Sequence, residues 1–152
     1  MNPNDLIWKP NVTVAAVIEQ DGKFLLIEEE TDSGLRLNQP AGHLEPNESL
    51  AAGAIRETLE ESAYHFEPRS LVGVYHYRHE RKEITYLRFA FAGELTGHER
   101  ERVLDAGIVR TVWMSPEEIR TSNRLRTPLV LRCIDDYLSG RRYPLDLLAY
   151  CA

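Results

Sequence analysis

The pattern of hydrophobic positions begins with two short β-type runs. The β-branched run VTVAAVI at 12–18 is separated from a second apolar run at 24–28 by the dipeptide Asp21-Gly22. Asp-Gly favours the two-residue turn of a β-hairpin, so we predict that the two runs are paired strands. The acidic run at 28–30 ends the second strand and is interpreted as solvent-facing.

Four more runs predict further strands. Two are short, at 35–39 and 108–114, and two are longer, at 70–78 and 83–95, joined by a charged turn. The last alternates between two faces, with Leu87, Phe89 and Phe91 on one and Tyr86, Arg88, Ala90 and Ala92 on the other. The first set is expected in the core. The second set either forms a half-exposed face or lines a pocket, where tyrosines would stack on a base and Arg88 would contact the substrate.

A helical pattern follows Asn47, whose side chain is predicted to cap the helix start. On a wheel of about 100° per residue, one side carries Ser49, Gly53, Arg56, Glu57, Glu60 and Glu61. The other carries Ala51, Ala52, Ile55, Thr58 and Leu59, and we expect this side to rest on the sheet. Two later helices are predicted, one capped by Ser115 with Pro116 in its first turn, and one capped by Thr127 that spans 128–139 and stops at Gly140.

Composition predicts one domain over residues 1–152. A chain of 152 residues that is 43% hydrophobic is long enough to bury a core. A net charge of −6 argues against binding nucleic acid, and no apolar run of 18 residues or signal segment is present. The two cysteines, Cys133 and Cys151, lack metal-ligand spacing and are not expected to form a disulfide. We therefore expect a cytoplasmic protein with neither a nucleic-acid nor a membrane partner.

The predicted helix after Asn47 also carries the strongest chemical signal. Glu57, Glu60 and Glu61 lie three and four residues apart, and like charges at this spacing destabilise a helix. Carboxylate oxygens without His or Cys favour Mg²⁺, or Mn²⁺, over Zn²⁺. Arg56 is expected to orient a neighbouring carboxylate, and Gly53 to leave room for an ion or phosphate.

These residues resemble the Nudix box, which reads Gly, five residues, Glu, seven residues, Arg-Glu-apolar-x-Glu-Glu-x-Gly-apolar. The chain matches it with Gly42, Glu48, Arg56, Glu57, Glu60 and Glu61, and departs from it at Thr58 and Ala63. The resemblance implies an α+β Nudix fold, an α/β/α sandwich with a mixed β-sheet, where the residues alone predict only a mixture of helix and strand. It also implies a Mg²⁺-dependent hydrolase with the Gly42 carbonyl among the metal ligands and Glu48 as a supporting partner of the arginine.

Further segments are similar to bacterial phosphatases of this family, namely NQPAGHLE at 38–45, SPEEI at 115–119, TPLV at 127–130 and RRYPL at 141–145. This similarity implies hydrolysis of phosphoanhydride bonds in nucleoside tri- and diphosphates and related pyrimidine diphosphates, with orthophosphate as product. One alternative is a Nudix pyrophosphatase acting on ADP-ribose or dinucleoside polyphosphates. Another is a non-catalytic module that senses nucleotides. A monomer is expected, with a dimer as the alternative.

The general base stays open at this level. In the wider family a loop carboxylate in this region often serves as base or extra metal ligand, but Gly107 stands where relatives are frequently acidic. The candidates are Glu99, Glu101 and Asp105, with water activation by the metal ions alone as a fourth option.

Overall fold

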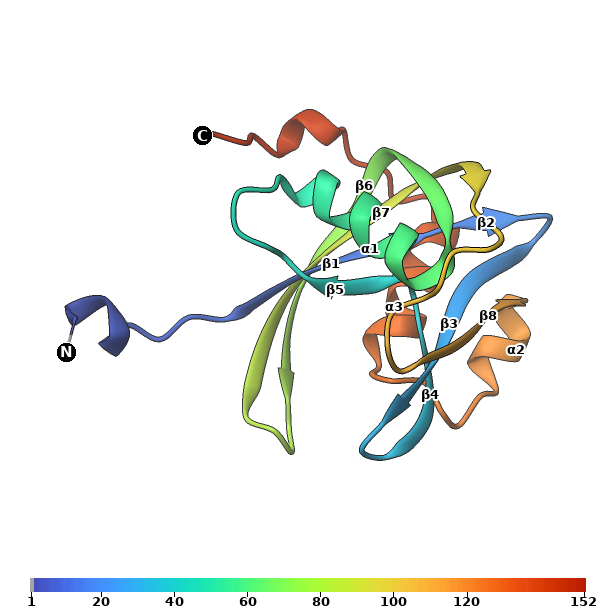
Figure 1. The fold of residues 1–152 in the computed structure, drawn as a ribbon, viewed down its shortest axis with the longest axis horizontal. Helices are drawn as coiled ribbons and strands as arrows, with labels where there is room; N and C mark the ends of the chain where they lie inside the picture. Colours follow the sequence, from blue (N-terminus) through green and yellow to red (C-terminus); the bar gives the residue numbers. More distant parts are fainter. Residues whose placement is uncertain (1) are drawn as a thin grey trace.

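The computed structural model describes residues 2–152 and divides the strands between two sheets (Figure 1). The strands of the first sheet, in spatial order, are β5 (Ala41–His43), β1 (Asn11–Val17), β7 (Ile84–His98) and β6 (Tyr64–His79). This sheet is mixed: β1 is parallel to β7 and antiparallel to β5, and β6 and β7 form a long antiparallel hairpin.

The second sheet is antiparallel and centres on β3 (Lys23–Thr31). The strands that pair with it are β2 (Glu19–Gln20), β4 (Gly34–Asn38) and β8 (Ile108–Met114). The predicted hairpin was wrong in its first strand. Asp21 and Gly22 form the turn, with φ of 51° and 80°, but they join β3 to the short β2.

Strand β1 belongs to the mixed sheet and does not pair with β3, because its continuous apolar run suits a central position in a sheet. Its residues Val14 to Val17 are buried, and a strand pairs with it on either edge. A two-stranded hairpin would leave one of these edges open. The mixed sheet that the sequence predicts is therefore built around β1.

Three helices complete the layers: α1 (Leu50–Ser62), α2 (Pro116–Arg120) and α3 (Leu129–Leu138). Short 3₁₀ turns lie at Pro3–Leu6 and Leu145–Leu147. Ser115 caps α2, as predicted, and Glu118 completes a capping box that was not predicted. Helix α3 begins one residue later than predicted and its N-cap position is Pro128, so the predicted Thr127 cap is wrong. The Thr127 hydroxyl, one residue before the cap position, accepts from the N–H of Leu129 at 3.2 Å. Gly140, with φ of 93°, follows its end.

Two hydrophobic clusters lie on the two faces of the mixed sheet. One joins Val14, Phe91 and Ala54 of α1, and the other joins Ala90, Ala92 and residues of α3. The face of β7 that carries Arg88 is therefore covered, and Arg88 itself is 5% exposed. This arrangement is the predicted α/β/α sandwich. No helix within residues 2–152 is long and apolar enough to cross a membrane.

Candidate active site

The cap of helix α1 lies two residues later in the sequence than predicted. Ser49, in an extended conformation, accepts a hydrogen bond from the N–H of Ala52 at 3.1 Å. Asn47 has φ of 65° and serves the preceding turn, because a short polar side chain tolerates the left-handed region. The predicted Asn47 cap is therefore wrong, and the cap is Ser49.

The buried side of α1 is also different from the predicted one. Glu57 and Glu61 are each 8% exposed, whereas Ile55 is 38% exposed. The helix thus presents its glutamates toward β5 and the sheet, while part of its apolar side faces solvent. Thr58, which departs from the motif, is fully buried, and its hydroxyl donates to the carbonyl of Ala54 at 2.7 Å.

Arg56 organises the carboxylates along this side of α1. Its Nε and Nη2 donate to the two oxygens of Glu48 at 2.9 and 2.8 Å, a bidentate pair. Its Nη1 donates to Glu57 at 2.9 Å and to Glu60 at 3.1 Å, and lies 3.4 Å from Glu45. One guanidinium therefore fixes Glu48 and restrains both glutamates of the next turn.

The ionisation of these groups reflects burial and pairing. The hydrogen bonds from Arg56 lower the pKa of Glu48, and the same pairing raises the pKa of Arg56. Burial raises the pKa of Glu57 and raises that of Glu61 to about 8, although Glu61 accepts a hydrogen bond from the N–H of Ala41 at 2.8 Å. Two carboxylates are thus held where their negative charge is poorly solvated, which favours a cation beside them.

Two glycines give the carboxylates room. A Cβ on Gly42 would lie 2.5 Å from Oε2 of Glu57 and closer still to its Cδ and Oε1, so only glycine permits this approach. The space at Gly53 was predicted to hold an ion or phosphate, but a Cβ there would lie 2.9 Å from Glu48 and 3.2 Å from Val14. Gly53 therefore accommodates Glu48 and strand β1.

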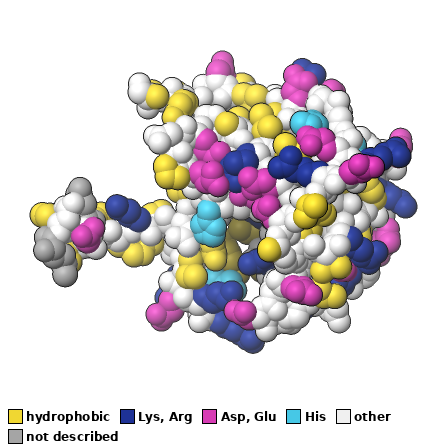
Figure 2. Space-filling model, in the orientation of Figure 1, with side chains coloured by type: hydrophobic (Ala, Val, Ile, Leu, Met, Phe, Trp, Pro, Cys, Tyr) yellow, Lys and Arg dark blue, Asp and Glu magenta, His cyan; other side chains and the backbone are white. Residues whose placement is uncertain are grey.

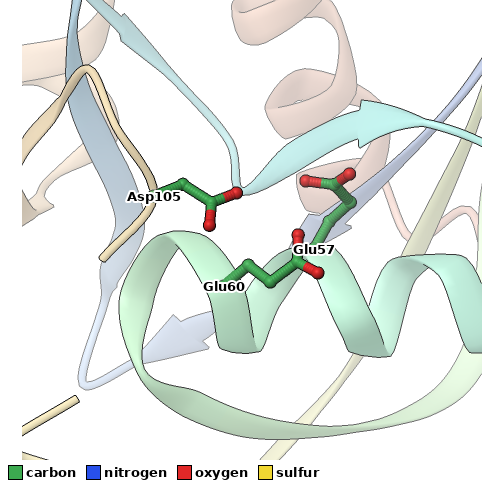
Figure 3. Close-up of side chains that lie close together, drawn as sticks. All are labelled: Glu57, Glu60 and Asp105. Atoms are coloured by element: carbon green, nitrogen blue, oxygen red, sulfur yellow. The ribbon is translucent and has the colours of Figure 1, made fainter. Parts of the chain in front are cut away.

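Three carboxylates from two elements converge at the end of α1 (Figure 3). Glu57 and Glu60 come from the helix, and Asp105 comes from the loop before β8; one oxygen of each lies within 4.8 Å of the others. The N–H of Asp105 donates to the carbonyl of Glu60 at 3.0 Å, which ties the loop to the helix. Of the three glutamates predicted as ligands, Glu57 and Glu60 belong to this group and Glu61 does not. Hard oxygen donors at this separation suit Mg²⁺ or Mn²⁺, and Asp105 is placed either to join them or to act on a water beside the ion.

The other two candidates for the general base do not belong to this group of carboxylates. Glu99 pairs with His65 at 2.6 Å and with Arg102 at 3.5 Å, and Glu101 is exposed. Gly107 has φ of 92°, and its carbonyl accepts from the N–H of Glu30 at 2.8 Å. Gly107 therefore provides the positive φ of the turn that leads into β8. The loop carboxylate that lies next to the glutamates is Asp105.

A cleft of about 980 Å³ opens beside these carboxylates. Gly42, Glu57 and Glu61 line one end, and Arg88 lies in its wall. In Figure 2 the acidic side chains gather next to the hollow on this face of the molecule. Aromatic, apolar and basic residues complete the lining, among them Tyr77, Tyr86, Leu125, Leu129, Arg36, Arg81 and Lys82. The cleft is acidic where the glutamates stand and carries cations elsewhere.

Sequence reasoning missed Asn38, which lines the cleft, and the buried Gln39 beside it. Both accept hydrogen bonds from Arg88, at 2.9 Å and 3.0 Å. They belong to the NQPAGHLE run, so the signal was present, but no pattern links residues 38 and 39 to residue 88. The interpretation of the acidic run at 28–30 was also wrong for Glu28, which is 5% exposed and paired with Arg110 and Arg124.

Comparison with known proteins agrees with this geometry. Residues 8–132 match the family model described as the NUDIX domain. The chain is 40% identical over 142 residues to the phosphatase NudJ of Escherichia coli K12, covering 93% of this chain and 92% of that protein. It superposes with a TM-score of 0.92 on a NUDIX hydrolase structure from Nitrosomonas europaea that is 53% identical, covering 94% of this chain and 98% of the other. A MutT NUDIX hydrolase from Burkholderia pseudomallei, 19% identical with a TM-score of 0.73 and covering 85% of this chain and 98% of its own, shares the fold.

Proposed function

Because this chain belongs to the Nudix hydrolase family, we propose that it is a Mg²⁺-dependent phosphatase of nucleoside tri- and diphosphates and related pyrimidine diphosphates. The observation that carries the proposal is the convergence of Glu57, Glu60 and Asp105, because Glu57 of this group also lines a nucleotide-sized cleft. Hard oxygen ligands that are partly withdrawn from water suit a divalent ion that also binds phosphate. The similarity to NudJ favours the phosphatase over the other family activities.

The residues that would hold Mg²⁺ are Glu57, Glu60 and Glu61, together with the carbonyl of Gly42. The ion would supply Lewis-acid stabilisation of the charge that develops on the phosphate oxygens. Burial of Glu57 and Glu61 supports this assignment, because a nearby cation offsets the cost of keeping their charges out of water. Mn²⁺ satisfies the same donor set.

Arg56 is a positioning residue in this proposal. It binds Glu48 through two hydrogen bonds and reaches Glu57 and Glu60 through its remaining nitrogen. Its role is to keep the carboxylate rotamers fixed before substrate arrives, which lowers the cost of assembling the site. Glu48 has a supporting role, since it holds the guanidinium in this orientation.

Asp105 is proposed as the general base. Its carboxylate stands beside the glutamates and is exposed, so it has access to water. The attacking water gives a proton to a carboxylate oxygen of Asp105 while its oxygen bonds to phosphorus. The bond between phosphorus and the bridging oxygen breaks, and the leaving phosphate carries away its electron pair.

The substrate is proposed to be a free nucleotide or a similar small diphosphate. The cleft offers aromatic and basic side chains beyond the carboxylates, and Arg88 contributes a substrate contact there. The net charge of −6 disfavours polynucleotides. We expect a monomeric enzyme of the cytoplasm, where free nucleotides are abundant.

The test is to incubate purified protein with Mg²⁺ and a nucleoside triphosphate and to measure orthophosphate and pyrophosphate separately. Orthophosphate as the first product supports the phosphatase. Pyrophosphate as the first product contradicts the phosphatase but keeps Nudix hydrolysis, and turnover of ADP-ribose alone moves the protein to the pyrophosphatase alternative. A parallel reaction with EDTA checks the metal requirement, and an enzyme that keeps full activity there would refute the metal site.

A further inference from the structure

Arg88 of β7 is a buried guanidinium whose partners are all neutral. It is 5% exposed, and its Nη1 donates to Oε1 of Gln39 at 3.0 Å and weakly to Sγ of Cys133 at 3.9 Å. Its Nη2 donates to Oδ1 of Asn38 at 2.9 Å. No carboxylate within residues 2–152 forms an ion pair with it, although buried charges are normally paired.

The neutral partners are held in one orientation. The Nε2 of Gln39 donates to the carbonyl of Val130 at 2.8 Å, so its oxygen is left for Arg88. Arginine has donors only, so Asn38 also turns its oxygen toward Arg88 and its NH₂ group away. The acceptors around Arg88 are therefore consumed by Arg88 itself.

The free hydrogen-bonding groups that are left here are donors. Within residues 2–152, every solvent-shielded side-chain nitrogen or oxygen has a hydrogen-bond partner. Nε of Arg88 and Nδ2 of Asn38 donate to no described group, and both residues line the cleft. These two nitrogens therefore reach the water of the cleft, and we call Arg88 and Asn38 together the donor recess.

Aromatic and aliphatic side chains line the same cleft as the donor recess. Tyr86 lies two residues before Arg88, on the same face of β7, and pairs in register with Tyr77 of β6. Both tyrosines line the cleft, as do Leu125 and Leu129. Aromatic and aliphatic walls suit a planar ring, and a base that stacks there turns its polar edge toward the donors. The hydrated charges of a phosphate are better satisfied by a cation at the carboxylate end of the cleft.

We propose that the donor recess selects the base of the substrate by its acceptors, an inference that rests on the proposed nucleotide hydrolysis. An edge with two adjacent acceptors matches it, as O6 and N7 of guanine or O2 and N3 of cytosine do. Adenine offers a donor amino group beside N7, and that group faces the recess unpaired. Guanine and cytosine nucleotides are therefore preferred over adenine nucleotides.

The test compares kcat/KM for GTP, CTP and ATP in the wild type and in Arg88→Lys. Lysine keeps the charge but loses the planar fork, so kcat/KM for GTP and CTP is expected to fall on the order of ten-fold, mainly through KM, with little change for ATP. The control is Arg81→Lys, an exposed residue at the rim of the same cleft, which is expected to leave the ratios among the three nucleotides unchanged.

A second variant covers a failure of Arg88→Lys to fold. Asn38→Asp gives Arg88 a carboxylate partner and turns the free donor into an acceptor. It is expected to raise the thermal midpoint and to remove the preference for GTP and CTP over ATP. A preference that survives in this variant overturns the proposal.

The remaining outcomes separate the two proposals. A wild type without preference, or an equal fall for all three nucleotides in Arg88→Lys, overturns base selection and leaves Arg88 as a phosphate ligand. A wild type that turns over no nucleotide overturns the proposed function, and calorimetry with GMP and AMP then tests the donor recess alone. Tighter GMP binding supports the recess, and equal binding refutes it.

Discussion

Replacing Gly42 by alanine tests the close contact between β5 and the glutamates of α1. The added Cβ would lie 2.5 Å from Oε2 of Glu57, whereas ordinary contact begins at 3.4 Å. The carboxylate must therefore move by about 1 Å, and a misplacement of this size costs about 10²-fold in rate when the displaced group takes part in catalysis. Overpacking of this kind also costs roughly 1–3 kcal/mol of unfolding free energy. We expect a folded protein with kcat/KM reduced about 10²-fold.

The assay is orthophosphate release from a nucleoside triphosphate as a function of Mg²⁺ concentration, with thermal unfolding followed on the same samples. Displacement of a ligand predicts that the variant needs more Mg²⁺ for half-maximal rate. Gly97→Ala is the matched control, because a Cβ there approaches no atom closer than 3.4 Å. Wild-type kcat/KM and an unchanged Mg²⁺ requirement in Gly42→Ala would refute the placement of Glu57 in the site.

Three further outcomes are expected. Glu60→Gln keeps its shape but loses a charge, so it should fold normally and lose most turnover; full activity at limiting Mg²⁺ argues against it as a ligand. Mg²⁺ at a concentration of 100 times its Kd should stabilise the folded protein by about 2.7 kcal/mol and so raise its thermal midpoint. A midpoint that Mg²⁺ leaves unchanged in both the wild type and Glu60→Gln argues against any ion at these carboxylates. Glu28→Gln removes the buried partner of Arg110 and Arg124 and should cost about 1–2 kcal/mol at pH 7. Those arginines lower the pKa of Glu28, so its contribution is present above pH 4.5 and is lost as pH falls through the lowered pKa. Urea titrations at pH 7 and pH 3 should show the gap between wild type and variant closing, and a constant gap contradicts the ion-pair explanation.

Most strands and helices could be predicted from periodicity, although several of their ends could not: β6 begins at Tyr64 and not at residue 70, and the cap of α1 is Ser49 and not Asn47. Ser115 and Pro116 mark the start of α2 by short-range chemistry, and the structure has the full capping box there. Strand pairing is a different matter. The run at 12–18 has the same local pattern whether it pairs across a tight turn or in parallel with a strand some 70 residues later, and the observed partner is β7. The choice of partner strand depends on burying both faces of β1, and the local sequence pattern does not determine which partner achieves this.

The candidate site, like the fold, could be predicted only in part from local sequence pattern. Spacing alone placed Glu57, Glu60 and Glu61 on one side of a helix, but the wheel assigned the apolar residues to the sheet. The structure buries Glu57 and Glu61 instead and leaves Ile55 38% exposed. A wheel assumes that buried means apolar, and this assumption fails where a helix brings charged groups into a site. Asp105 could not be separated from Glu99 and Glu101 because the separation rests on the hydrogen bond that joins its loop to α1.

Ala63 illustrates how a departure from a motif is absorbed. The motif has glycine at this position, and Ala63 adopts the left-handed conformation that favours glycine, with φ of 63° at the end of α1. Its N–H still donates to the carbonyl of Leu59 at 2.9 Å, so the helix ends as a glycine would end it. A left-handed alanine costs on the order of 1 kcal/mol, which burial of its methyl group partly offsets. The substitution therefore changes stability slightly and leaves the position of Glu60 and Glu61 intact.

Two parts of the cleft lining place opposite demands on a ligand. Burial raises the pKa of Glu57 and Glu61, so a cation is favoured beside them. Arg88 is buried without a carboxylate partner, so acceptors are favoured beside it. A nucleotide with its metal ion satisfies both demands at once, whereas a free base or free phosphate satisfies one. Binding energy gained at the donor recess then adds to that gained by the phosphates at the carboxylates, which links the choice of base to kcat/KM.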